Sequence, residues 1–182
     1  MHQLPNLLTL LRLALTIPIA CLLLAERHAQ ALSLFAVAGA SDALDGFLAR
    51  RFGWTSRLGS ILDPLADKLL LVTSYVCLAL SAVLPWWLTL LVLLRDALIV
   101  GGAALYRQLR GPFAFRPSWL GKASTLLQIV LVLAVLLELS VFPAFVVVHW
   151  PLVAAVVGLT LLSGGDYLRT WIAKFRATRL PA

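Results

Sequence analysis

The chain has 182 residues, of which 62% are hydrophobic and only 13% are charged. A soluble domain typically carries about a quarter charged residues and about half apolar ones, so this composition excludes a disordered chain, a disulfide scaffold and an ordinary soluble enzyme. The formal net charge is +7. Because so apolar a chain is not expected to have a soluble basic surface, we expect no nucleic-acid partner. The composition predicts one membrane domain over residues 1–182.

Six apolar runs are each long enough to form a membrane-spanning helix, which needs about 20 residues. They predict spans near residues 6–25, 30–49, 62–83, 86–106, 120–139 and 144–164. Charged stretches at 26–28 and 50–57 and prolines at 85, 112, 117 and 143 separate these runs. The first run lacks a basic start and a cleavage site, so we expect a retained span rather than a signal peptide. Cys21 and Cys77 lie inside apolar runs and are expected to be free, small fillers.

The basic residues predict an orientation in the membrane. If both termini face the cytoplasm, Arg27 alone falls outside and most Lys and Arg residues fall inside, which is the bias expected for cytoplasmic loops. The inside residues are Arg50, Arg51, Arg57, Arg107, Arg110, Arg116, Lys122, Arg169, Lys174, Arg176 and Arg179. The predicted fold class is an all-α integral membrane protein with six transmembrane helices and both termini cytoplasmic. We expect it in a bacterial cytoplasmic (inner) membrane.

Four of the eight acidic residues crowd into one stretch of the chain. Asp42 and Asp45 are three residues apart at the end of the second predicted span, and Asp63 and Asp67 are four apart at the start of the third. These spacings place each pair on one helix face. A short connection makes the two helices antiparallel neighbours, so the carboxylates can converge. Carboxylates at membrane depth are costly and indicate a functional site.

The chemistry of these carboxylates favours a divalent cation. Packed together they would repel one another, and oxygen donors without His or Cys select Mg²⁺, Mn²⁺ or Ca²⁺ rather than zinc. The alternative interpretation is that the aspartates form interfacial ion pairs with Arg50, Arg57 and Lys68. Such pairs do not require matched spacings on two helices, so we favour the metal site.

The residues between the two pairs complete a motif. Gly46, Ala49 and Gly59 leave room for a ligand against the backbone, and Pro64 suits the first turn of a helix. The stretch 42–67 reads D-x2-D-G-x2-A-R-x8-G-x3-D-x3-D. The chain resembles the CDP-alcohol phosphatidyltransferase family, whose motif it matches at every fixed position. The six apolar runs extend the resemblance over nearly the whole chain.

The resemblance implies an enzyme that transfers a phosphatidyl group from CDP-diacylglycerol to an alcohol and releases CMP. It implies a site for two Mg²⁺ or Mn²⁺ ions held by Asp42, Asp45 and Asp63. Asp67 is implied as a further metal ligand and as the base for the acceptor hydroxyl. It also implies a homodimer, for which the small residues 101–104 offer a helix contact, internal or between subunits. The implied CDP-binding residues are Asp42, Gly46, Ala49, Arg50 and Gly59.

Several polar residues outside the motif are candidates for the acceptor site. Asn6, Thr9 and Arg12 repeat every three residues on one helix face, and Arg12 would offer a phosphate a fork of donors or would snorkel to the interface. Arg95-Asp96 is expected to be an internal pair that orients the acceptor or joins helices. Gly121-Lys122 would place a cation and helix amides near an anion, or would anchor the helix. The candidate acceptor-binding residues are Asn6, Thr9, Arg12, Arg95, Arg116 and Lys122.

The choice of acceptor rests on resemblance alone. Asn6, Thr9 and Arg12 look like the phosphatidylglycerophosphate synthase and CMP-forming cardiolipin synthase branches. The stretch 84–89 leading to Arg95-Asp96 looks more like the cardiolipin branch, which favours phosphatidylglycerol as acceptor over glycerol 3-phosphate. Two other classes stay open: an intramembrane prenyltransferase, which usually needs more spans, and a small ion transporter, which would place its carboxylates near the midplane.

Overall fold

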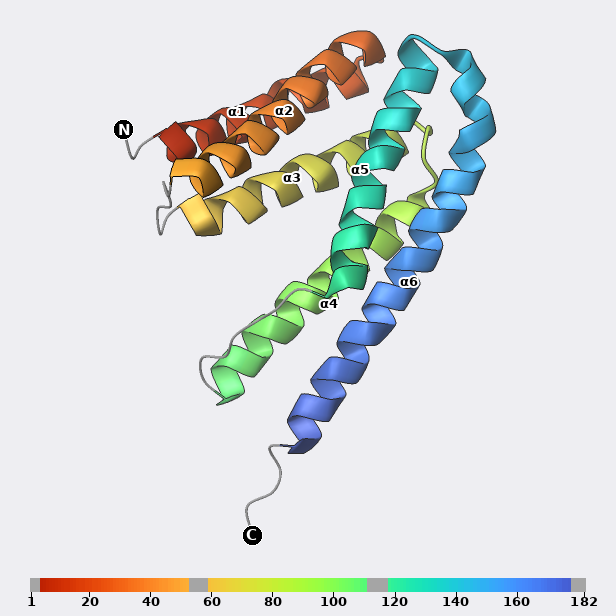
Figure 1. Cartoon of the computed structure of the whole chain (residues 1–182). Coiled ribbons are helices and arrows are strands. Elements are labelled where there is room, and N and C mark those ends of the chain that lie inside the picture. Colours follow the sequence, from red (N-terminus) through yellow and green to blue (C-terminus); the bar gives the residue numbers. More distant parts are fainter. Residues whose placement is uncertain (1–3, 53–58, 111–117, 178–182) are drawn as a thin grey trace. The chain divides into compact units, whose positions relative to one another are not determined.

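The computed structural model describes residues 4–52, 59–110 and 118–177. Within these ranges the protein is all-helical, with one α-helix in each predicted apolar run and no strand (Figure 1). The elements are α1 (Leu4–Leu24), α2 (His28–Phe52), α3 (Gly59–Leu80), α4 (Trp86–Arg110), α5 (Trp119–Ser140), the short 3-10 helix η1 (Pro143–Phe145) and α6 (Val146–Ala177).

Three described stretches are long and apolar enough to cross a membrane: Trp86–Gln108, Trp119–Ser140 and Pro143–Trp171. A shorter apolar stretch, Thr9–Leu24, lies in α1. The helices α2 and α3 carry the four aspartates of the motif and are not among these three stretches. An all-helical chain with these apolar stretches is consistent with a membrane protein, while the six spans and the cytoplasmic termini stay predictions.

Two tight turns end helices where the sequence predicted breaks. Glu26 and Ala82 adopt the left-handed conformation, with φ of 58° and 55°. After each, a backbone N–H bonds back across the last helical turn, from Arg27 to Leu22 at 2.9 Å and from Val83 to Leu78 at 2.9 Å. This is the Schellman arrangement, which satisfies the last carbonyls of a helix. The turns let α2 follow α1, and α4 follow α3, after only a few residues.

Two expectations about helix ends were wrong. Pro64 is the sixth residue of α3, beyond the first turn, because the helix already begins at Gly59. The last helix does not end near residue 164 but continues to Ala177. Tyr167 and Trp171 are buried in this extension, and tertiary packing of this kind stabilises a helix beyond its local propensity.

The helices form two compact units. One comprises residues 1–85 and 132–146 and contains α1, α2, α3 and the end of α5; in it α1 packs against both α2 and α3 (Figure 1). The other comprises residues 86–131 and 147–182 and contains α4, most of α5 and most of α6. The aspartate motif belongs to the first unit, and Arg95 and Lys122 belong to the second.

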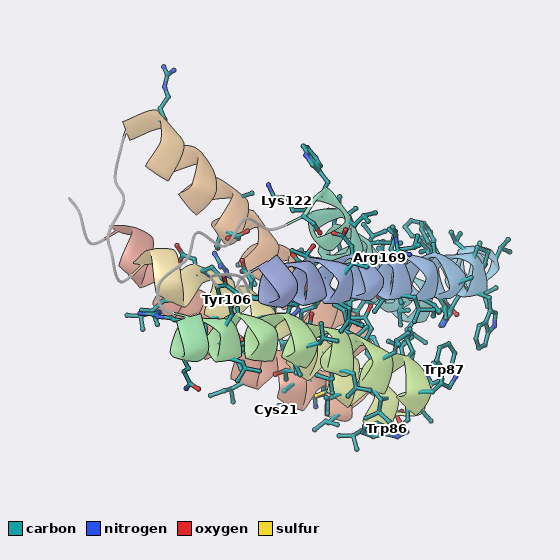
Figure 2. All side chains as sticks on the ribbon, turned by 90° about the horizontal axis from the view of Figure 1, so that it is seen from below. Cys21, Trp86, Trp87, Tyr106, Lys122 and Arg169 are labelled. Carbon is teal, nitrogen blue, oxygen red and sulfur yellow. The ribbon has the colours of Figure 1, made fainter. Side chains whose placement is uncertain are left out.

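Four of the described tryptophans are exposed at or near the starts of helices. Trp86 and Trp87 are 48% and 53% exposed at the start of α4, where Figure 2 shows them projecting from the ribbon. Trp119 and Trp150 are also exposed. Trp171 differs, because it is buried against Gly102 and its ring lies 5.6 Å from that of Tyr106. Both cysteines are free; Cys77 is buried, as expected of a small apolar filler, whereas Cys21 is exposed.

Candidate active site

One arginine of α1 links carboxylates from two other helices. Arg12 is only 1% exposed. Its Nη1 lies 2.5 Å from Oδ1 of Asp67 on α3, and its Nη2 lies 2.8 Å from Oδ1 of Asp42 on α2. Both carboxylate side chains are about half exposed, at 49% for Asp42 and 46% for Asp67. A buried positive charge therefore bridges two half-exposed carboxylates.

A second residue of α1 contacts the third aspartate. Thr9 is buried and donates its hydroxyl to Oδ1 of Asp63 on α3. Because Thr9 and Arg12 are three residues apart, they share one helix face, as the sequence predicted. The buried Thr16 continues this face and donates to the Arg12 carbonyl at 3.0 Å. One face of α1 thus gathers Asp42, Asp63 and Asp67.

Other predicted site residues are only partly described. Asn6 lies in α1, Gly59 begins α3, and the side chains at these positions lie outside the described part of the structure. The same holds for the residues of α2 that complete the motif, which are Asp45, Gly46, Ala49 and Arg50. Arg116 falls outside the described residues altogether.

The gathered side chains fit a divalent cation in their chemistry. All three described aspartates present oxygen donors, the ligands that Mg²⁺ and Mn²⁺ prefer. Two of them converge on one positive group, and the third accepts from a hydroxyl. Among the described side chains, no three are grouped closely enough as they stand to hold one ion. Asp45, the remaining predicted ligand, is not among them.

A different arginine joins the three helices of the second unit. Arg95 of α4 forms a buried ion pair with Asp96 at 2.9 Å. Its Nε and Nη2 donate to Oγ of Ser163 on α6, at 3.3 and 2.8 Å, and Nη2 also donates to the Gly121 carbonyl on α5 at 3.2 Å. The pair is internal, as expected, and its geometry is that of a brace between helices.

A cavity of about 450 Å³ adjoins this brace. Its lining includes Arg95, Lys122 and Tyr167, so two of the candidate acceptor-binding residues share one cavity. Lys122 is exposed, with its ammonium 5.5 Å from the centre of the Trp119 ring. Gly121 packs closely here, because a Cβ at this position would lie 2.9 Å from the Tyr167 hydroxyl and 3.2 Å from Nη2 of Arg95, so these side chains would have to shift.

Sequence reasoning missed two residues of this second unit, Tyr167 and Ser163. Tyr167 accepts a hydrogen bond from the backbone N–H of Ser118 at 3.2 Å, and the Ser118 hydroxyl in turn accepts from the N–H of Gly121 at 3.1 Å as an N-cap. The sequence carried no signal for Tyr167, because the predicted sixth span ended before it. A buried serine facing an intramembrane arginine is visible only once the helices are packed.

Comparison with known proteins places the chain in a family. Residues 2–162 match the model of the CDP-alcohol phosphatidyltransferase family. A Mycobacterium tuberculosis protein provisionally named a phosphatidylglycerophosphate synthase is 35% identical over 175 residues, which cover 91% of this chain and 80% of the relative.

Two further relatives bear the other name. A Mycobacterium tuberculosis protein provisionally named a cardiolipin synthase is 40% identical over 123 residues, covering 66% of this chain and 58% of the relative. The CMP-forming cardiolipin synthase of Rattus norvegicus is 36% identical over 146 residues, covering 71% and 48%. The matched region therefore spans less than two thirds of the length of these two relatives.

Proposed function

Because the chain belongs to the CDP-alcohol phosphatidyltransferase family, we propose that it transfers a phosphatidyl group from CDP-diacylglycerol to an alcohol and releases CMP. Members of this family use CDP-linked donors and alcohol acceptors and generally depend on a divalent metal. The observation that carries the proposal is the gathering of Asp42, Asp63 and Asp67 on one face of α1. It brings distant parts of the motif to one place.

The proposed mechanism assigns each motif residue a task. Asp42, Asp45 and Asp63 hold Mg²⁺ or Mn²⁺, and Asp67 contributes to the second ion. When bound, these ions supply positive charge to the diphosphate and to the leaving CMP oxygen. The remaining motif positions, Gly46, Ala49, Arg50 and Gly59, line the CDP pocket in this proposal.

Asp67 is the proposed base. Its carboxylate takes the proton from the acceptor hydroxyl while the acceptor oxygen forms a bond to the phosphatidyl phosphorus and the bond from that phosphorus to the CMP oxygen breaks. Its half-exposed side chain is open to a hydroxyl from outside the helix packing. The Arg12 guanidinium holds this carboxylate in place at 2.5 Å.

We propose phosphatidylglycerol as the acceptor, giving cardiolipin, with glycerol 3-phosphate as the alternative. Relatives carry both names, so the names do not decide. Both acceptors contain a phosphate, and the cations beside the largely apolar cavity of the second unit are Lys122 and Arg95. Since the Arg95 donors are already bonded within the protein, Lys122 is the stronger candidate of the two. Asn6, Thr9, Arg12 and Arg116 remain proposed acceptor-binding residues.

We place the enzyme in a bacterial cytoplasmic membrane with the aspartate site on the cytoplasmic side, as a homodimer. The support for this orientation is the one-sided distribution of Lys and Arg around the apolar helices. The homodimer is what the family resemblance implies. The cytoplasmic face is also where a water-soluble product such as CMP can leave.

The test offers purified protein CDP-diacylglycerol labelled in its cytidine, with each acceptor in a separate reaction. CMP release is measured, and the lipid product is identified by mass. We expect release that depends on metal and acceptor, with cardiolipin formed from phosphatidylglycerol. Phosphatidylglycerophosphate from glycerol 3-phosphate, with no cardiolipin, would overturn the acceptor and leave the reaction class standing. Absence of CMP release with every acceptor would overturn the reaction class.

A further inference from the structure

The cationic group at the centre of the aspartate cluster belongs to the protein itself. We infer that Arg12 is the resident counter-charge of Asp42 and Asp67, and that a divalent cation binds these aspartates in competition with it. The inference rests on the proposed function, which assigns the aspartates to metal. It differs from both sequence-based interpretations of Arg12, as a ligand for the phosphate of an acceptor or as a side chain that snorkels to the interface.

The competition follows from the atoms involved. Nη1 and Nη2 of Arg12 approach Oδ1 of Asp67 and Oδ1 of Asp42 at 2.5 and 2.8 Å. Mg²⁺ would approach carboxylate oxygens at about 2.0–2.1 Å. A guanidinium and a divalent ion on the same pair of carboxylates would also be like charges within a few ångströms, which strongly disfavours their coexistence. Binding of the ion therefore requires Arg12 to give up at least one of its two partners.

Few hydrogen bonds hold the Arg12 guanidinium in its position. Arg12 Nε has no hydrogen-bond partner among the described residues, and its Nη2 faces Asp42 without hydrogen-bond geometry. Buried donors left unbonded carry a free-energy cost. Arg95 offers the contrast, because each of its three nitrogens bonds to a carboxylate, hydroxyl or carbonyl. Among the described residues, Arg12 keeps one such bond, from Nη1 to Oδ1 of Asp67, together with its ion pair to Asp42.

The exposure of the side chains in the cluster also supports the competition. Asp42 and Asp67 are half exposed while Arg12 is buried. An ion arriving from water therefore meets the carboxylates before it meets the guanidinium. Removing the positive charge of Arg12 should strengthen ion binding and should weaken the protein in the absence of ion, because two nearby carboxylates lose their counter-charge.

The experiment titrates the purified full-length protein with Mn²⁺, with no lipid substrate present, and measures free Mn²⁺ by electron paramagnetic resonance. The variants are Arg12→Gln and Arg12→Lys, with Arg27→Gln as the matched control. Arg27 is exposed in the turn after α1. It lies about 22 Å along the helix from Arg12 at 1.5 Å per residue, well beyond the screening length of about 8 Å at physiological salt.

We expect Arg12→Gln to bind Mn²⁺ about tenfold more tightly, the size of effect that one nearby like charge produces at a partly solvated site. Arg12→Lys keeps the charge but not the fork that spans two carboxylates, so its affinity should fall between those of Arg12→Gln and the unaltered protein. Arg27→Gln should bind as the unaltered protein does. Mn²⁺ should also raise the unfolding temperature of Arg12→Gln more than that of the unaltered protein, because tighter binding to the folded state stabilises it more.

Each other outcome has a definite meaning. Equal or weaker Mn²⁺ binding by Arg12→Gln, with binding by the unaltered protein intact, would overturn the competition and leave the proposed function standing. If Arg12→Gln fails to fold, Arg12→Lys decides, and binding no tighter than that of the unaltered protein overturns the inference. An unaltered protein that binds no Mn²⁺ would overturn the metal site itself, and the inference with it.

Discussion

At the scale of single residues, the task proposed for Asp67 is specific to its carboxylate. In Asp67→Asn an amide of nearly the same shape replaces the carboxylate, so the group can no longer take a proton. Loss of a general base typically lowers a rate by about 10²- to 10⁴-fold. We therefore expect CMP release to fall by that factor, measured with saturating CDP-diacylglycerol and acceptor.

The control for this variant is Glu26→Gln, the same chemical change at an exposed position in the turn after α1. It should retain normal turnover. Circular dichroism and gel filtration in detergent must show that Asp67→Asn is folded, since the change also weakens its ion pair with Arg12. Near-normal CMP release from folded Asp67→Asn would refute its role as base.

Asp63 provides a separate test of the metal ligands. Its described contact is the Thr9 hydroxyl, so Asp63→Ala removes a proposed ligand without breaking the ion pairs of Arg12. CMP release should fall and should no longer rise as Mg²⁺ or Mn²⁺ is added. Thr9→Ser, which keeps the hydroxyl, should retain the metal response. A normal metal response in Asp63→Ala would remove Asp63 from the proposed ligands.

The sequence predicted the shared face of Thr9 and Arg12 but not what that face contacts. A spacing of three residues fixes a face of one helix, whereas the neighbour of that face depends on how α1 packs. The motif spacing likewise predicted that Asp42 lies near Asp63 and Asp67, but it did not predict that α1 contacts all three. The alternative interpretation paired these aspartates with Arg50, Arg57 and Lys68, whereas the ion pairs that the structure describes for Asp42 and Asp67 are with Arg12.

At the scale of helices, the contact of α4 with α6 depends on one glycine. A Cβ on Gly102 would lie 2.8 Å from Nε1 and 2.9 Å from Cε2 of Trp171. Gly102→Ala should therefore lower the free energy of unfolding by about 1–3 kcal/mol, the usual cost of overpacking. Gly101→Ala is the control, because a Cβ there meets nothing within 4 Å. Denaturant unfolding in detergent, followed by tryptophan fluorescence, compares the two, and equal stabilities would contradict the predicted steric clash.

Arg95 gives a second prediction about the contacts between helices. In Arg95→Gln the buried Asp96 loses its ion-pair partner, a change that typically costs about 3–5 kcal/mol, so the unfolding midpoint should fall. Lys122→Gln removes an exposed cation from the same cavity and should raise the KM for acceptor without a comparable loss of stability. A normally stable Arg95→Gln with a raised acceptor KM would instead identify Arg95 as a substrate ligand.

The helices themselves were largely predictable, because an apolar run of sufficient length has few alternatives in a membrane. The error at α6 has a physical reason. Gly164, Gly165 and Asp166 interrupt the apolar run, yet the helix continues because Tyr167 and Trp171 pack in the next turns. Gly102 shows the same limit. Its small size predicted a helix contact, and only the structure shows that the contact is with Trp171.

At the scale of the whole molecule, the orientation in the membrane is open to a direct test. With Cys21 and Cys77 replaced by serine, a cysteine at position 27 should react with a membrane-impermeant maleimide added to intact cells. A cysteine at position 107 should react only after the membrane is opened. The reason is the predicted retention of Lys and Arg on the cytoplasmic side. Labelling of position 107 in intact cells would reverse the orientation.

The length of α6 has a consequence for how the protein responds to its lipid surroundings. Its 32 residues extend about 48 Å at 1.5 Å per residue, whereas the hydrocarbon layer is about 30 Å thick. A tilt alone would have to exceed the usual upper limit of about 40° to hide the whole helix. In the predicted orientation its C-terminal turns, with Asp166 and Arg169, then extend among the phospholipid headgroups on the cytoplasmic side. Thinner or thicker bilayers would change how far these turns emerge without drawing their charges into the acyl chains, so the enzyme should tolerate variation in acyl-chain length.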